Sequence, residues 1–236
     1  MSKTLKALSA LLTYPTQELQ DAAPEIGVVL AEDALIPAAA WRQLSKLTTE
    51  LATGDLYDLQ ERYVLLFDRT RSLSLHLFEH VHGESRDRGQ AMIDLKAQYE
   101  RNGLAMTEAE LPDFLPLFLE YLSTRPLAES CESLGQPAHI FAALAERLRK
   151  RHSLYEAVFR ALIVLANAKP AEDAVSALMQ TPDPDASDFA ALDAAWEDEP
   201  VTFGPGAAGC KDSLIARVRG ALRPAPDMPR NIPPRA

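Results

Sequence analysis

Apolar residues recur at helical spacing through most of this chain, and that pattern limits the folds open to it. Two such stripes are Leu5, Leu8, Leu11 and Leu12 near the N-terminus and Tyr155, Val158, Phe159, Leu162 and Leu165 further along. A spacing of three or four residues places side chains on one face of an α-helix. No alternation of apolar and polar residues, the pattern of a half-buried strand, competes with these stripes. The sequence therefore predicts an all-α protein.

Helix boundary signals divide the chain into short helices. Tyr14-Pro15 stops the first helix, because the residue before a proline avoids helical geometry. Gly54 ends a later helix, and Asp55 can cap the next one. Asn102-Gly103 and Pro137 mark a further end and a further start. The spacing of these signals predicts a single compact, bundle-like domain.

Composition and charge exclude several classes of partner. The chain has 236 residues, of which 47% are hydrophobic, and a formal net charge of -10. Such an acidic chain is not expected to bind nucleic acid or an anionic membrane surface. We see no apolar run that could span a bilayer and no secretory signal pattern. The two cysteines form no CxxC pair, which is typical of a reducing cytoplasm, so we predict a cytoplasmic protein without stable membrane insertion.

The last part of the chain differs from the rest. Residues 181–200 contain seven acidic residues and no Lys or Arg, and five prolines follow from Pro224 onward. Proline-rich sequence without an apolar stripe buries little surface. We therefore predict a helical domain over residues 1–180, followed over residues 181–236 by an acidic linker and an irregular, proline-rich, partly mobile tail.

The stretch from His76 to Met92 holds the densest polar chemistry of the chain. Three of the five histidines fall within seven positions, at His76, His80 and His82, and a run of charges follows around Gly83 and Gly89. Ser85 can cap the helix that begins after this turn. We therefore expect two helical segments to meet at a tight polar corner.

Two kinds of ligand site match part of the pattern at this corner. His76 and His80 share a helix face, as in a metal site, but the spacing is not HExxH and no cysteine is near. Ser85 and Arg86 could hold an anion at a helix N-terminus, although the GK[ST] ending of a phosphate loop is missing. Salt bridges within a structural corner explain the same residues, so we expect neither metal nor cofactor.

At these residues the sequence resembles a known family. Phe78-Glu-His-Val-His-Gly-Glu-Ser-Arg-Asp-Arg-Gly-Gln-Ala-Met92 is similar to the hallmark of the NarJ family, the assembly chaperones of respiratory nitrate reductase. Tyr63-x-x-Leu66-Phe67 and Leu111-Pro-Asp-x-Leu-Pro116 also match. One position departs from the wider family of redox-enzyme chaperones, which usually has histidine where this chain has Phe114.

The resemblance implies an all-helical chaperone of the redox-enzyme type, not an enzyme, that binds the N-terminal segment of the nitrate reductase catalytic subunit and holds it for molybdenum cofactor insertion. We expect the partner to contact Tyr63, Leu66, Phe67, Glu79, His80, His82, Glu84, Arg86, Asp87, Arg88, Pro112 and Asp113. The alternative is a small nucleotide- or anion-binding enzyme or switch that uses the histidine and arginine corner. A generic helical scaffold is a third hypothesis.

Overall fold

The computed structural model describes residues 2–81, 86–106 and 110–184, and of Arg86 and Asp87 it describes the backbone only. Ten α-helices lie in these ranges: α1 Lys3–Leu11, α2 Gln17–Glu32, α3 Ala38–Thr53, α4 Leu56–Tyr63, α5 Arg86–Arg101, α6 Leu115–Ser123, α7 Leu127–Gly135, α8 Ala138–Lys150, α9 Glu156–Ala166 and α10 Glu172–Gln180. The described part of the chain contains no β-strand. The prediction of an all-α protein is therefore confirmed.

Short polar side chains start several helices, as the sequence predicts. The hydroxyl of Ser2 accepts a hydrogen bond from the amide of Leu5, and Thr16 does the same for Leu19. Asp55 caps α4 by accepting from two backbone amides. Each bond satisfies an amide that has no partner within its own helix. The sequence analysis did not predict α7 and α10.

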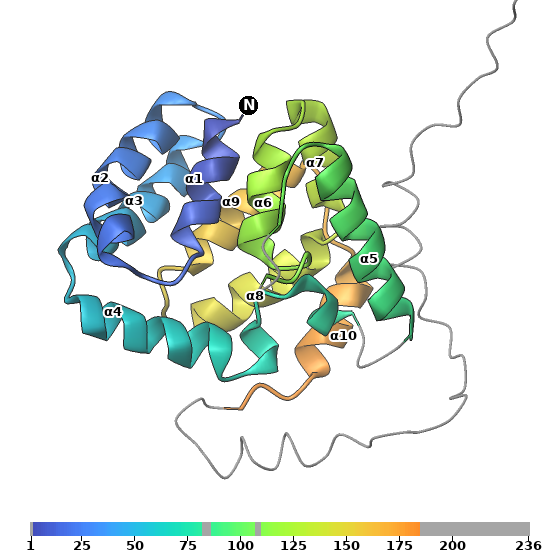
Figure 1. The fold of residues 1–236 in the computed structure, drawn as a ribbon. Helices are drawn as coiled ribbons and strands as arrows, with labels where there is room; N and C mark the ends of the chain where they lie inside the picture. Colours follow the sequence, from blue (N-terminus) through green and yellow to red (C-terminus); the bar gives the residue numbers. More distant parts are fainter. Residues whose placement is uncertain (1, 82–85, 107–109, 185–236) are drawn as a thin grey trace, which may run out of the picture.

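The helices pack around one hydrophobic core (Figure 1). α2 lies against α1 and α3, while α6 packs on the other side of α1. α9 contacts α3, α7 and α8, and its residues Val158, Phe159, Ala161 and Leu162 are completely buried. The nearly continuous apolar sequence of α9 is thus explained by neighbours on several sides.

The connection from α4 to the central stretch is irregular. α4 passes directly into a π-helical turn, η1, over Val64–Asp68. Two short 3₁₀ turns follow, η2 over Arg71–Leu73 and η3 over Leu77–His80. The sequence predicts that two helical segments meet at the polar corner; the segment before the corner consists of short 3₁₀ turns, and α5 is the helix after it. π-Helical turns are rare and often occur at functional sites.

No helix in the described ranges is long and apolar enough to cross a membrane. The predicted tail lies almost entirely outside the described residues, so its irregularity and the boundary at residue 180 stay predictions.

Candidate partner-binding site

A buried carboxylate, Asp113, holds the polar corner together. Its side chain is completely buried, and one oxygen accepts a hydrogen bond of 3.1 Å from the amide of Phe78 at the start of η3. The other oxygen lies 3.3 Å from Nδ1 of His76. A buried carboxylate is stable only when such donors surround it. Asp113 therefore ties the turn before α6 to the segment before η3.

Backbone bonds fasten the same two segments. His76 and Phe114 form an isolated antiparallel bridge, in which the carbonyl of Asp113 accepts from the amide of Leu77 at 3.0 Å. The hydroxyl of Tyr99 on α5 donates to the carbonyl of Pro112 at 2.8 Å. Pro112 is itself buried and lies next to Asp113, so these two bonds hold neighbouring carbonyls. The corner is thus a rigid junction of η3, α5 and α6.

The two described histidines of the corner have opposite electrostatics. The hydrogen bond to Asp113 raises the pKa of His76, and the charges of Asp113 and Glu79 act in the same direction, against burial and Arg88. Burial lowers the pKa of His80, whose Nε2 lies 2.7 Å from the carbonyl of Ser74. Because only a protonated nitrogen can donate to that carbonyl, the neutral His80 carries its hydrogen on Nε2.

A surface of mixed character lies over this junction. The ring of Phe114 packs against that of His76 with centroids 5.3 Å apart, and Leu111, which is 47% exposed, begins the turn that ends at Phe114. The exposed carboxylate of Asp68 interacts electrostatically with His76, as does Glu79. We name Asp68, His76, Glu79, Leu111 and Phe114 the corner surface. It places carboxylates next to partly exposed apolar side chains.

Five of the predicted partner-binding residues lie beneath the surface: Pro112 and Asp113, as described above, and Tyr63, Leu66 and Phe67. Tyr63 and Phe67 are each 4% exposed and Leu66 is 7% exposed. Tyr63 and Phe67 pack against each other and against Tyr155 in an aromatic cluster, where the hydroxyl of Tyr63 donates to the carbonyl of Leu12. In this conformation they support the α4–η1 junction from inside.

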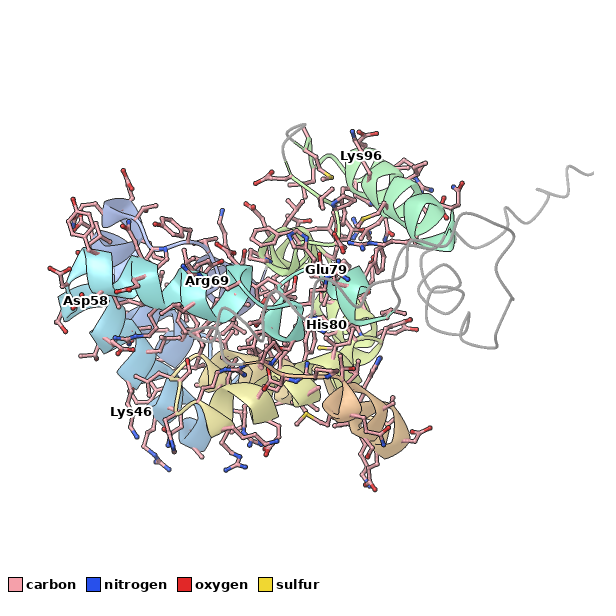
Figure 2. All side chains as sticks on the ribbon, turned by 90° about the horizontal axis from the view of Figure 1, so that it is seen from below. Lys46, Asp58, Arg69, Glu79, His80 and Lys96 are labelled. Atoms are coloured by element: carbon pink, nitrogen blue, oxygen red, sulfur yellow. The ribbon has the colours of Figure 1, made fainter. Side chains whose placement is uncertain are left out.

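Other predicted residues lie on or near η3. Figure 2 shows Glu79 and His80 on η3, with α5 and α10 on opposite sides in that view. Glu79 is paired with Arg88 on α5 at 3.7 Å, and both side chains are partly exposed. His82 and Glu84 lie outside the described residues, as do the side chains of Arg86 and Asp87. The anion-binding alternative depends mainly on these residues, so it stays a prediction.

No group of three or more His, Cys, Asp or Glu side chains in the described ranges is arranged to hold a metal ion. The histidine that would complete the triplet, His82, is outside those ranges.

Sequence reasoning expected the partner near the corner that begins at His76, but it did not assign three members of the corner surface to partner binding: Asp68, Leu111 and Phe114. Leu111 and Phe114 lie within the quoted motif Leu111-Pro-Asp-x-Leu-Pro116, but the sequence alone does not show which side chains of that motif stay exposed. The bridge between His76 and Phe114 joins segments 38 positions apart. No local pattern predicts such a pairing.

The site is therefore a surface on an all-helical protein, with carboxylates beside partly exposed apolar side chains. Comparison with known proteins defines the family: the chain belongs to the nitrate reductase delta subunit family, whose model matches residues 33–161. The predicted resemblance to the NarJ family is confirmed.

Relatives of the chain carry consistent names. It is 44% identical to the nitrate reductase molybdenum cofactor assembly chaperone NarJ of Escherichia coli (strain K12), over 93% of this chain and 94% of that protein. It is 41% identical to NarW of the same strain, named as a probable chaperone of the same kind, over 84% and 83%. A NarJ of Bacillus subtilis (strain 168), also named as probable, is 33% identical over 68% and 86%. These names support a chaperone role rather than catalysis.

Proposed function

We propose that this protein is a chaperone for nitrate reductase that binds the N-terminal segment of the catalytic subunit and holds that subunit for molybdenum cofactor insertion. The relatives named above support the chaperone role. The structural observation that supports the site is the corner surface, which lies within residues 33–161, the range that the family model matches. The cytoplasm is the compartment in which we expect this to occur.

The chemistry of the corner surface suits such a peptide. The resemblance implies a segment like a twin-arginine signal, which has a basic head and an apolar stretch. Asp68 and Glu79 can receive the basic head, and Leu111 and Phe114 can contact the apolar stretch. Solvent-exposed ion pairs contribute at most about 1 kcal/mol each, so apolar burial should dominate the affinity. The carboxylates then determine the orientation of the peptide.

Calorimetry with a synthetic peptide of the catalytic subunit's N-terminal segment tests the proposal. Leu111→Ser removes exposed apolar surface at the corner and should weaken binding about 3- to 10-fold, since Leu111 is 47% exposed and burial of that part of the side chain contributes roughly 0.7–1.4 kcal/mol. Leu127→Ser is the matched control, because Leu127 on α7 is 42% exposed and lies away from the corner. Its affinity should equal that of the wild type.

Asp113→Ala and Phe67→Ala test whether these two buried residues are needed to hold the binding surface in place. Both should weaken binding as well, and circular dichroism must first show that each variant is folded, because both remove buried groups. The proposal is wrong if the wild type binds no peptide at micromolar concentration. If Leu111→Ser, Asp113→Ala and Phe67→Ala all bind like the wild type, the peptide binds elsewhere.

A further inference from the structure

The outward side of α4 and η1 leads from the start of α4 to the corner surface. Because η1 continues α4 directly, the two form one helical rod about 20 Å long, at about 1.5 Å per residue. Its inner side is buried at Leu59, Tyr63 and Phe67. Its outward residues recur three or four positions apart, and all are exposed or partly exposed. We name them the α4 face: Tyr57, Glu61, Val64, Leu65 and Asp68.

The α4 face begins with the most exposed large apolar side chain in the described ranges. Tyr57 is 80% exposed. It is not isolated, because Val64 and Leu65 follow it on the same side of the rod. A peptide bound mainly by apolar burial needs more apolar surface than Leu111 and Phe114 offer at the corner. The α4 face supplies such surface.

The α4 face is continuous with the corner surface. Asp68 belongs to both, because it ends η1 and interacts electrostatically with His76. Figure 2 shows Asp58 and Arg69 towards the two ends of the rod, with Glu79 of the corner surface beyond Arg69 in that view. A peptide that lies partly on the corner surface can therefore continue along α4.

Charge distinguishes α4 from the other helix that borders the corner. α5 also exposes a large apolar side chain, Ile93, which is 62% exposed. Side chains three or four positions apart are neighbours on a helix. Glu61 is such a neighbour of Tyr57, and Asp58 is adjacent to it, whereas the neighbours of Ile93 include Lys96 and no acidic residue. A basic peptide is therefore complementary to α4 and not to the outward side of α5.

Hydrogen bonds from the inner side hold α4 in place. The side-chain amide of Gln60 donates to the carbonyl of Pro15 at 2.8 Å, and the hydroxyl of Tyr63 donates to the carbonyl of Leu12 at 2.8 Å. Both acceptors lie in the segment where α1 ends and α2 has not yet begun. The α4 face is thus a preformed surface, which lowers the cost of binding on it.

We propose that the α4 face is a second part of the partner-binding site, along which the catalytic subunit's N-terminal segment continues from the corner surface. Apolar side chains of the segment pack on Val64 and Leu65. A basic side chain lies on the ring of Tyr57 and pairs with Glu61, since aromatic rings attract cations. This inference rests on the proposed function and extends its site.

Tyr57→Ser in the full chain is the direct test, with calorimetry and the same synthetic peptide. The affinity should fall at least about fivefold, because the variant removes both apolar surface and the ring that attracts the cation. Tyr57→Phe keeps the ring and should bind within about twofold of the wild type. Ile93→Ser is the matched control, an equally drastic change at an exposed apolar position on α5, and should bind like the wild type. All three positions are exposed, so circular dichroism should show unchanged folding.

Glu61→Gln tests the charge. It should weaken binding about two- to threefold at low salt, and the difference from the wild type should vanish at about 0.5 M sodium chloride. A loss that persists unchanged at that salt concentration would contradict the pairing of Glu61 with a basic side chain.

The outcomes separate this inference from the proposed function. If Leu111→Ser weakens binding and Tyr57→Ser does not, the inference is overturned and the proposed function stands. Weaker binding by Ile93→Ser but not by Tyr57→Ser would place the continuation on α5 and would also overturn it. So would sedimentation showing that the wild type self-associates and Tyr57→Ser does not, since the face would then bind a second copy. If the wild type binds no peptide, the proposed function itself fails.

Discussion

At the scale of single residues, the corner depends on groups whose protonation differs between the folded and unfolded chain. His76 holds its proton more tightly when folded, because its Nδ1 faces the buried carboxylate of Asp113. His80 holds its proton less tightly, because it is buried close to Arg147. Two histidines four positions apart therefore oppose each other in the pH dependence of stability.

Replacing one histidine at a time should give opposite dependences of the free energy of unfolding on pH. The stabilisation from His76 is complete below its unfolded pKa of about 6.5 and is lost as pH rises through its higher folded pKa. That from neutral His80 is complete above about 6.5 and is lost as pH falls towards its lower folded pKa. As the pH falls from about 7.5 to about 5.5, the free energy of unfolding should therefore rise in His80→Gln, which keeps His76. It should fall in His76→Gln, which keeps His80.

Urea denaturation at several pH values measures both trends. Asp113→Asn in the His80→Gln background is the control: removal of the carboxylate's charge should flatten the gain on acidification. Parallel pH profiles in the two single variants would contradict the assignment of opposite pKa shifts.

At the scale of secondary-structure elements, the segment after α9 is attached by polar side chains more than by apolar burial. No residue of α10 is fully buried. Arg147 of α8 instead donates to the carbonyls of Leu178 and Thr181, and Arg151, the residue after α8, donates to the carboxylate of Asp183. Hydrogen bonds from the end of α8 thus hold residues 178–183 against the rest of the protein. Composition alone does not predict these bonds.

Two truncations distinguish the contacts of Thr181 and Asp183 with α8 from the proline-rich end of the chain. Deletion of residues 224–236 should leave the melting temperature unchanged within about 1 °C, because proline-rich sequence without an apolar stripe buries little. Deletion of residues 181–236 also removes Asp183 and the Thr181 carbonyl, and the loss of about 1–3 kcal/mol should lower the melting temperature by about 3–8 °C. Differential scanning calorimetry measures both. Equal melting temperatures for the two truncations would show that the contacts of Thr181 and Asp183 contribute no stability.

At the scale of the whole molecule, an acidic surface surrounds one apolar core. If the proposed function is right, the net charge of -10 should attract the basic peptide over long range, whereas close binding at the corner should depend on apolar contact. Long-range attraction between exposed charges is screened by salt, and apolar burial is not.

Raised salt should therefore weaken peptide binding only modestly. Between about 0.05 and 0.5 M sodium chloride we expect a loss of affinity below about fivefold, measured by calorimetry. The variant Asp68→Asn/Glu79→Gln should show a smaller salt dependence than the wild type. A loss of a hundredfold or more would mean that charge, not apolar burial, dominates the affinity.

The sequence by itself determined the fold class, most helices and the family. Helical spacing and the signals at Pro15, Asp55, Gly103 and Pro137 act within a few residues of each other, so they can be read locally. The central stretch could also be found, because its polar density is unusual in an otherwise amphipathic chain.

Only the tertiary structure decided what that stretch does. The burial of Asp113 and Phe67, the bridge from His76 to Phe114 and the reach of Arg147 to Ser72 join residues distant in sequence. A carboxylate in a turn looks exposed in sequence, and it is buried here because the backbone amide of Phe78 and the ring of His76 converge on it. Such convergence is set by packing of whole helices, which bring donors and acceptors together regardless of local pattern.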